Sequence, residues 1–241
     1  MRPWRTIDSI TTPEGQLELR QRDERYFLIT IAGRVLMTSL AHRSEDALAR
    51  LACAALAGRP RARVLLGGLG MGQTLRAALN ELPSTVRITM AELNQRVVDW
   101  CRGPLAILTD EAIADPRVKV VVEDVARVIA RAPADGYDAI ILDLYEGPHA
   151  ATNRIRDPLY GEQAVARMFA ALAPGGVVAI WSEEADPPFE ARLAAGGFRV
   201  ERILAGSGGR RHVIYLGTRP SMTDRRSRPG SFTAKGQPGN K

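Results

Sequence analysis

An acid at the end of an apolar segment is the residue in this sequence best placed for chemistry. The segment DAIIL, residues 138–142, leads directly to Asp143, and Tyr145 and Glu146 follow shortly after. Packing of a buried strand does not require an acid at its end, whereas a carboxylate there can orient an amine or accept its proton. We therefore predict that Asp143, Glu146 and Tyr145 are catalytic, and that the two carboxylates suit a cationic substrate.

Three glycines follow another apolar segment, in the stretch VLLGGLGMGQTL of residues 64–75. Gly68, Gly70 and Gly72 are spaced G-x-G-x-G, and glycine lets the backbone turn sharply and approach a ligand closely. A helix beginning near Gln73 would point its free N–H groups at the same place. Because a dinucleotide-binding loop needs a small residue where Gln73 stands, we predict a nucleoside with a sulfonium or short polar tail. A tight turn with only a structural role is the alternative.

Two more acids follow the next predicted strands. Glu92 comes after the strand at 86–91, at about the distance from the glycines at which an acid meets ribose hydroxyls. A solvated surface position is the alternative for Glu92. Asp124 comes after the strand at 118–122, where its carboxylate could accept from an adenine amino group or cap the following helix. Together with Asp143 and the glycine loop, these acids form the predicted cofactor site.

Apolar strands and helical segments alternate through most of the chain. The predicted strands are 63–67, 86–91, 118–122, 138–142, 177–181, 198–204 and 212–217. The predicted helices between them are 73–81, 95–101, 124–131, 160–172 and 188–195. This alternation predicts an α/β fold in which helices cover both faces of a mostly parallel sheet. The last two strands are joined without a helix, so we expect an antiparallel pair at the end of a seven-stranded, Rossmann-like, doubly wound sheet.

The chain divides into three predicted parts, namely an N-terminal β-hairpin unit at 1–43, a nucleoside-binding transferase domain at 44–219 and a disordered basic tail at 220–241. Residues 15–38 alternate apolar and polar, as a hairpin does, with turn residues that include Gly33. A helical run at 44–57 has Ser44 as its predicted N-cap and Gly58 as its stop. In the stretch DPPF, Asp186 is predicted to cap the helix that follows.

Charge and cysteine usage restrict the partners. The net charge is +6, and the Gly/Pro/Ser-rich stretch at 221–241 alone carries +4 of it, so the folded part is close to neutral, which argues against nucleic acid as a partner. The sequence has neither an apolar run long enough to span a membrane nor the apolar segment of a signal peptide at its start. Cys53 and Cys101 have no metal-ligand spacing, so we predict buried thiols, no metal and a cytoplasmic location.

Several longer stretches resemble one known family. They are RVLLGGLGMGQTLRAAL, ADPRVKVVVEDV, YDAIILDLYEGP and PLYGEQAVARMFAALAPGGVVAI. Over residues 15–217 the chain is similar to the spermidine synthase (aminopropyltransferase) family, within the class I S-adenosylmethionine-dependent methyltransferase superfamily. The resemblance implies decarboxylated S-adenosylmethionine as cofactor and a small-molecule amine or other nucleophile as acceptor, with a homodimer as one candidate assembly. It also implies that Glu92 binds ribose, that Asp124 lies near adenine and that Asp143 activates the attacking amine.

The chain departs from this family at positions that matter for the choice of substrate. Met71 stands where the family's glycine loop has an aspartate that binds the amino end of the aminopropyl group. Leu36 stands near the family's polyamine-binding glutamine, and Arg43 and Ser44 stand near its Tyr-His pair. S-Adenosylmethionine itself, whose carboxylate a helix N-terminus can hold, fits this loop as well. Methyl transfer and a non-catalytic, nucleoside-binding role therefore stay open beside aminopropyl transfer.

Overall fold

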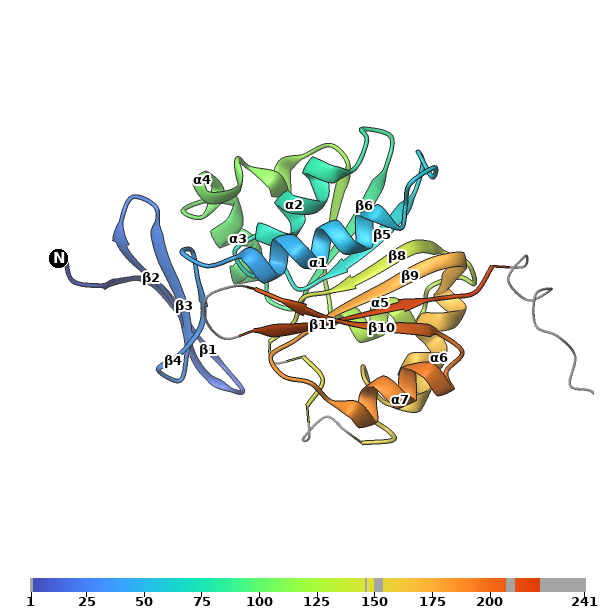
Figure 1. Cartoon of the computed structure of the whole chain (residues 1–241). Helices are drawn as coiled ribbons and strands as arrows, with labels where there is room; N and C mark the ends of the chain where they lie inside the picture. Colours follow the sequence, from blue (N-terminus) through green and yellow to red (C-terminus); the bar gives the residue numbers. More distant parts are fainter. Residues whose placement is uncertain (1, 146, 150–153, 207–210, 222–241) are drawn as a thin grey trace, which may run out of the picture.

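The centre of the fold is a seven-stranded sheet with helices on both faces (Figure 1). The computed structural model describes residues 2–145, 147–149, 154–206 and 211–221 of the chain. The strand order is β10-β11-β9-β8-β5-β6-β7, and β11 is antiparallel to both of its neighbours whereas the other neighbouring pairs are parallel. The strands are β5 (Arg63–Gly67), β6 (Arg87–Glu92), β7 (Val118–Val122), β8 (Tyr137–Leu142), β9 (Leu172–Ser182), β10 (Arg199–Ala205) and β11 (His212–Thr218). The predicted fold class and the predicted antiparallel last pair are confirmed.

Two cores lie on the two faces of this sheet because successive side chains of a strand point in opposite directions. In β5, Val64 and Leu66 belong to one core and Leu65 belongs to the other. The first core is covered by α1 (Arg43–Ala54), α2 (Gln73–Glu81) and α3 (Gln95–Arg102), and the second by α5 (Val125–Ala130), α6 (Glu162–Ala171) and α7 (Pro187–Ala195). Two short elements, α4 (Ala106–Thr109) and the 3-10 helix η1 (Ala112–Ala114), were not predicted.

The N-terminal unit is a four-stranded antiparallel sheet rather than the predicted hairpin at 15–38. Its strands are β1 (Arg5–Thr12), β2 (Gly15–Asp23), β3 (Tyr26–Ile31) and β4 (Arg34–Thr38), paired in chain order. The unpredicted strand β1 has a register shift between Thr6 and Asp8, so Ile7 and Ile10 both pack on the first core although they are three residues apart. This bulge hides the two-residue period by which a strand is recognised.

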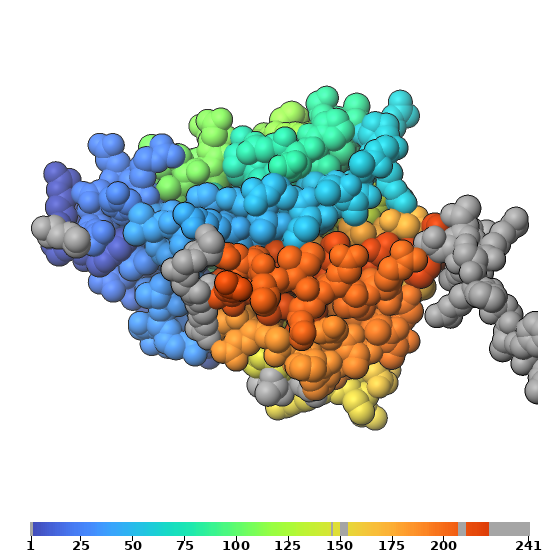
Figure 2. Space-filling model, viewed as in Figure 1, coloured from blue at the N-terminus to red at the C-terminus, as the bar shows by residue number. Residues whose placement is uncertain are grey.

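The N-terminal sheet lies at one end of the molecule, against the first core. Blue N-terminal residues gather at that end in the space-filling view (Figure 2). Leu19 and Phe27, from β2 and β3, are fully buried in the core that α1 and α2 cover. The sheet is therefore anchored on the domain by its inward-facing apolar side chains, and Figure 1 shows it beside one end of the central sheet.

The start of α1 differs from the prediction. Its N-cap residue is His42, and the Ser44 hydroxyl donates to Glu45 Oε2 at 2.7 Å, so Ser44 is not the N-cap. The His42 ring lies 2.9 Å from Asp46 Oδ2, and this pairing of residues four apart orders the first turn. The helix ends at Ala54, before the predicted stop at Gly58.

Other local predictions agree with the structure. Asp186 is the N-cap of α7 and accepts from the Phe189 N–H at 3.1 Å. Cys53 and Cys101 are buried free thiols, and burial raises the pKa of each to about 12. In the described part of the chain, no helix is long and apolar enough to cross a membrane.

The last described residues are fixed to the domain through Arg219. Its backbone N–H donates to Gly176 O at 2.9 Å, and its guanidinium donates to Asp135 Oδ1 at 2.7 Å and to Phe169 O at 3.0 Å. The guanidinium also lies 4.9 Å from the centroid of the Phe169 ring. Arg219 therefore joins the end of β11 to β9, to the turn before β8 and to the end of α6. Residues 222–241, which include almost all of the predicted basic tail, lie outside the described residues.

Candidate active site

A cavity of about 1300 Å³ lies between the N-terminal sheet and the carboxyl ends of the central strands. It opens where β5 has β6 on one side and β8 on the other, which is the reversal point at which doubly wound sheets bind ligands. Four residues at the strand ends, which we call the strand-end group, line it: Gly68, Gly70, Glu92 and Asp143. The sequence thus predicted which edge of the sheet carries the cavity.

The glycine loop needs glycine for its backbone angles and for space. Gly68 has φ +90°, and a Cβ there would lie 2.0 Å from Asp143 O. Gly70 has φ +51°, and its Cβ would lie 2.8 Å from the Met37 thioether. Gly72, with φ +82°, is the N-cap of α2, which begins at Gln73 as predicted. Among these four predicted cofactor residues, Gly68 and Gly70 line the cavity, whereas Gly72 and Gln73, at the start of α2, are not among its lining residues.

The Glu92 carboxylate joins the end of β6 to the glycine loop. Its Oε2 accepts from the Leu69 N–H at 2.9 Å, and its Oε1 accepts from the Asn94 N–H at 2.9 Å. The side chain is 9% exposed, so the alternative of a solvated surface position is wrong. Burial raises the pKa of Glu92, and the backbone N–H groups partly oppose this rise. The predicted contact of Glu92 with a ribose requires only the lone pairs that these two hydrogen bonds leave available.

Asp124 has the structural role that was the alternative to binding adenine. It is the N-cap of α5, and its side chain accepts from the Ala126 N–H at 2.8 Å. It follows β7 and is not among the residues that line the cavity, whereas the strand-end group follows β5, β6 and β8. A contact between Asp124 and an adenine stays a prediction, and the helix cap already explains why an acid stands at this position.

Asp143 lies half-buried in the cavity wall, directly after β8. The Thr74 hydroxyl of α2 donates to its Oδ2, and its own N–H donates to Gly67 O at 2.9 Å. Burial raises the pKa of the Asp143 carboxyl from 3.8 to about 7, the negative charge of Glu45 adds to the rise, and the Thr74 hydrogen bond opposes it. A carboxylate with such a pKa can accept a proton near neutral pH.

Tyr145 connects the loop after β8 with the N-terminal sheet. Its hydroxyl accepts from Arg34 Nη2, and the Arg34 guanidinium lies 5.3 Å from the ring centroid. Tyr145 lines the cavity and is 51% exposed. The third predicted catalytic residue, Glu146, lies outside the described residues.

Two features of the site were missed by sequence reasoning. Glu45, in the first turn of α1, lines the cavity, and its negative charge raises the pKa of Asp143. From the sequence, an acid at this position is explained by its favourable interaction with the helix N-terminus alone. Met71 is fully buried in the first core, and its N–H donates to Met37 Sδ at 3.2 Å. The position at which the resemblance places an acid therefore holds a core side chain. Contacts between distant segments of this kind have no local signal in the sequence.

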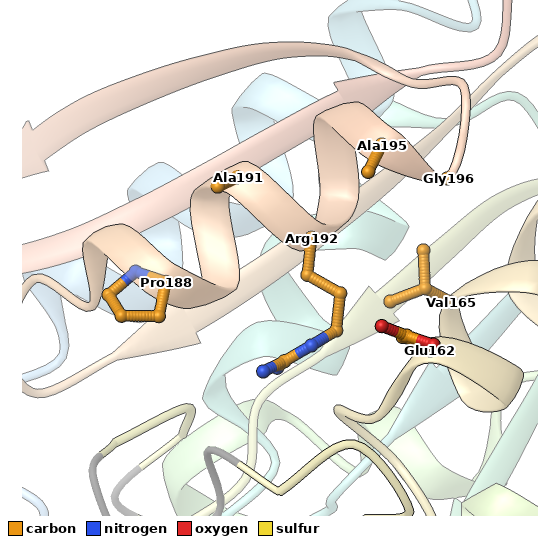
Figure 3. Close-up of a pocket in the computed structure, with 7 residues that line it drawn as sticks. All are labelled: Glu162, Val165, Pro188, Ala191, Arg192, Ala195 and Gly196. Atoms are coloured by element: carbon orange, nitrogen blue, oxygen red, sulfur yellow. The ribbon is translucent and has the colours of Figure 1, made fainter.

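A second cavity, of about 510 Å³, lies between α6 and α7 (Figure 3). Arg192 extends from α7 toward α6, and its Nη1 donates to Tyr160 O at 2.8 Å. Glu162 and Val165 of α6 line the other side. This cavity is remote from the strand ends, the glycine loop and Asp143, so it does not belong to the candidate active site. Among the described residues, no group of three or more His, Cys, Asp or Glu is placed to hold a metal ion.

Comparison with known proteins agrees with this geometry. Residues 44–190 match the family model of the spermine/spermidine synthase domain. The chain belongs to this family. The matched segment begins within the first turn of α1 and ends within α7, so it contains the glycine loop, Glu92 and Asp143.

Curated relatives in the family carry two different names. A polyamine aminopropyltransferase of Aeropyrum pernix is 34% identical over 122 residues, which are 51% of this chain and 37% of that protein. A putrescine N-methyltransferase 2 of Nicotiana attenuata is 37% identical over 121 residues, which are 50% of this chain and 31% of that protein. The chain thus matches about a third of the length of these two relatives.

A solved structure confirms the fold over most of the chain. The spermidine synthase from Thermotoga maritima superposes with a TM-score of 0.71 and 20% sequence identity, covering 91% of this chain and 75% of that one. At this identity the likeness shows the shared fold, including the methyltransferase-like sheet, and the choice of substrate has to be argued from the site itself.

Proposed function

We propose that the protein is a transferase that moves an aminopropyl group from decarboxylated S-adenosylmethionine to an amine, in the cytoplasm. The observation that carries the proposal is Asp143, which lies half-buried at the sheet's reversal point, next to the glycine loop, with a pKa near neutrality. Membership of the spermine/spermidine synthase family and a relative named polyamine aminopropyltransferase support the same reaction class.

The residues of the strand-end group suit an adenosyl cofactor. A Cβ at Gly68 would meet Asp143 O and one at Gly70 would meet Met37, so glycine at these positions lets the loop pack closely against the end of β8 and against β4 while it lines the cavity. Glu92 lines the cavity and would accept from the ribose hydroxyls in this proposal, and the N-terminus of α2 follows the glycine loop directly. When bound, such a cofactor supplies a carbon whose bond to the sulfonium breaks as that carbon bonds to the acceptor nitrogen.

Asp143 performs the proton chemistry of the proposed reaction. Its carboxylate orients the acceptor amine toward the glycine loop and takes the proton that the nitrogen releases. Thr74 fixes the carboxylate by donating to Oδ2, so the other oxygen is left to face the amine. Tyr145, held by Arg34, lies at the rim of the same cavity and limits the directions from which an amine can enter.

Methyl transfer from S-adenosylmethionine is the second candidate, and one observation favours it. The buried Met71 leaves the glycine loop without an anionic side chain for the ammonium of an aminopropyl group. An ammonium that loses water without gaining an anionic partner binds poorly. A relative named putrescine N-methyltransferase 2 shows that the family includes proteins named for methyl transfer.

Product analysis separates the two reactions. The protein is incubated with an amine panel and with each cofactor in turn, and the mass of the product identifies the transferred group. Calorimetry measures the affinity of each cofactor and of methylthioadenosine. Tight binding of S-adenosylmethionine with weak binding of its decarboxylated form would favour methyl transfer. Nucleoside binding without any turnover would support a non-catalytic role, and absence of all nucleoside binding would refute each of these proposals.

A homodimer is a further, separate part of the proposal. Sedimentation of the purified chain measures its mass in solution, and a monomer at all concentrations would refute the dimer without affecting the proposed reaction.

A further inference from the structure

The cavity that contains Asp143 carries more acidic than basic side chains. Among the described residues, six carboxylates and two guanidiniums line it, namely Glu14, Glu45, Asp46, Glu92, Asp143 and Glu183 against Arg34 and Arg43. A cleft that is lined mainly by one sign of charge concentrates ligands of the opposite sign. The lining therefore favours a ligand that carries positive charge.

Most of these carboxylates already have a partner or are solvated. Glu92 accepts from two backbone N–H groups, and Asp46 pairs with the ring of the histidine that is the N-cap of α1. Glu183 also has an interaction partner. Glu14 is exposed in the turn between β1 and β2, where water solvates its charge. The charge of the two remaining carboxylates is the one that a ligand can still offset.

These two carboxylates, Glu45 and Asp143, lie near each other although they come from α1 and from the end of β8. The negative charge of Glu45 acts on Asp143 and raises its pKa. Ser44 donates to Glu45 Oε2, and Thr74 donates to Asp143 Oδ2. The second oxygen of each carboxylate is accessible and has no hydrogen-bond partner among the described residues. Two neighbouring like charges repel each other, and an ammonium between them would offset this repulsion.

We propose that Glu45 and Asp143 together bind the reacting nitrogen of the acceptor in its ammonium form. This inference rests on the proposed transferase function and gives Glu45 a role at the same site. The accessible oxygen of each carboxylate accepts one ammonium N–H. The acceptor can then enter as the ammonium ion that predominates at neutral pH rather than as the scarce neutral amine.

The two carboxylates have different tasks once the ammonium is bound. The proton of one N–H passes to Asp143, and the electron pair of that bond stays on the nitrogen. A neighbouring negative charge makes Asp143 a stronger base, so Glu45 favours this transfer while it keeps its own charge. The nitrogen then bonds to the transferred carbon as the bond from that carbon to sulfur breaks and leaves its electron pair on sulfur. Asp143 finally releases its proton to water.

Glu45→Gln tests the proposal with the amine of the panel that is turned over. The variant loses the charge but keeps an oxygen that can accept from Ser44, so the first turn of α1 should still form. KM for the amine should rise about tenfold while kcat changes by less than about threefold, because the lost contact is made before the reaction. Calorimetry with putrescine on the methylthioadenosine complex should show an affinity about tenfold below that of the unchanged protein, even without turnover. Unchanged KM or unchanged putrescine affinity would overturn the proposal.

Three further variants show whether the effect belongs to this position. Glu45→Asp keeps the charge and should restore most of the affinity. Glu81→Gln removes an exposed acid at the end of α2, outside the cavity, and should leave KM unchanged. Glu14→Gln removes another charge of the cavity and should raise KM by less than about twofold. Equal rises in Glu14→Gln and Glu45→Gln would assign the effect to the overall charge of the cavity and would refute a site at Glu45.

The pH profile provides a readout that a purely structural role of Glu45 would not change. In Glu45→Gln the rise of kcat/KM should move to lower pH, because the charge that raises the Asp143 pKa is gone. The other groups that act on or feel Asp143 are the Thr74 hydroxyl and Tyr160, whose raised pKa keeps it neutral, so neither moves the profile. A profile that does not move would show that Glu45 does not act at Asp143, and the proposal would fail.

The remaining outcomes separate the source of the ammonium and the failure of the proposed function. Decarboxylated S-adenosylhomocysteine carries an aminopropyl ammonium that methylthioadenosine lacks. If Glu45→Gln weakens its binding and leaves KM for the amine unchanged, Glu45 binds the cofactor and the proposal is wrong. If methylthioadenosine binds but putrescine does not bind to that complex and no amine is turned over, the ammonium site is refuted while nucleoside binding stands. If no nucleoside binds, the proposed function itself is wrong.

Discussion

The strand-end group and a second set of residues line one cavity but are held in place by different forces. The second set, which we call the acceptor wall, is formed by Ile31, Val35, Leu36, Leu40, Tyr145 and Trp181. Glu92 and Asp143 each have directional hydrogen bonds to the glycine loop or to α2. The acceptor wall consists mostly of apolar side chains, three of them more than half exposed, and they come from the N-terminal sheet, the segment after it, the loop after β8 and the end of β9. Directional bonds fix the position of a reacting group, whereas apolar contacts select a partner mainly by shape and size. We therefore expect few substitutions to be tolerated in the strand-end group. Substitutions in the acceptor wall should change which acceptor binds without removing the reacting groups.

The largest expected effect is the loss of the proposed base. Asp143→Asn should lower kcat/KM by about 10³-fold, because an amide does not accept the proton at neutral pH. Calorimetry should show nucleoside affinity close to that of the unchanged protein. Asp138→Asn is the matched control, since Asp138 lies at the opposite end of β8 and pairs with Arg59 at 2.7 Å. Full activity of Asp143→Asn would remove Asp143 from the mechanism.

The glycine loop should tolerate a methyl group at one position better than at another. Gly68→Ala should destabilise the protein by about 3 kcal/mol or more, because its Cβ would meet a backbone oxygen that cannot move aside. Gly70→Ala should cost only about 1 kcal/mol, since the obstacle there is the flexible end of Met37. Urea denaturation measures both. Equal losses would mean that the loop adjusts freely and that the strand-end group is not rigid.

The pH dependence of the reaction should report Asp143. The carboxyl must be ionised to accept a proton, so kcat/KM should rise by about tenfold per pH unit below its pKa and level off above it. The pKa of about 7 places this change near neutral pH. Because the folded pKa exceeds the unfolded value of 3.8, the ligand-free protein should also lose stability as pH rises from that value to about 7. Asp143→Asn should lack both effects, and an unchanged profile in that variant would assign them to another group.

Glu92 tests whether the strand-end group holds the nucleoside. Glu92→Gln places an amide donor against one of the two backbone N–H groups, so the affinity for methylthioadenosine should fall by about tenfold. Glu123→Gln is the control, because Glu123 stands at the next strand end and pairs with Arg131 near the surface. Unchanged affinity in Glu92→Gln would leave Glu92 with a structural role only.

The smallest expected effect separates the two roles of Asp124. Asp124→Ala should destabilise the protein by about 1 kcal/mol through loss of the α5 cap, and nucleoside affinity should stay the same. Asp124→Ser keeps a capping oxygen without the carboxylate and should be nearly as stable as the unchanged protein. A fall of nucleoside affinity in both variants would show that the carboxylate also binds adenine.

The difference between the two regions also explains what could be predicted from the sequence. The central strands, the glycine loop and the acids at the strand ends follow from local patterns, because a buried strand and the turn after it are short segments of chain. Even there, the sequence offered the Asp124 cap only as one of two alternatives, and the contact of Glu92 with the loop joins segments 23 residues apart, which no local pattern shows.

The acceptor wall could not be predicted in the same way. It is assembled from β3, β4, the segment after β4, the loop after β8 and the end of β9, which lie far apart in the sequence. Its supporting sheet includes β1, whose bulge hides the strand pattern. Likewise, nothing near Met71 in the sequence shows that its side chain enters the core while its N–H meets Met37.

The reversed direction of β11 has a practical consequence. His212, at the start of this strand, lines the cavity, whereas Arg219, just past its end, is fixed at the opposite edge of the sheet. The seven residues of β11 separate these edges by about 20 Å. A solid support, a fluorophore or a fusion partner joined beyond residue 221 would therefore be held by Arg219 on the side away from the cavity. Immobilised protein prepared in this way would keep its cavity accessible to screening with libraries of amines.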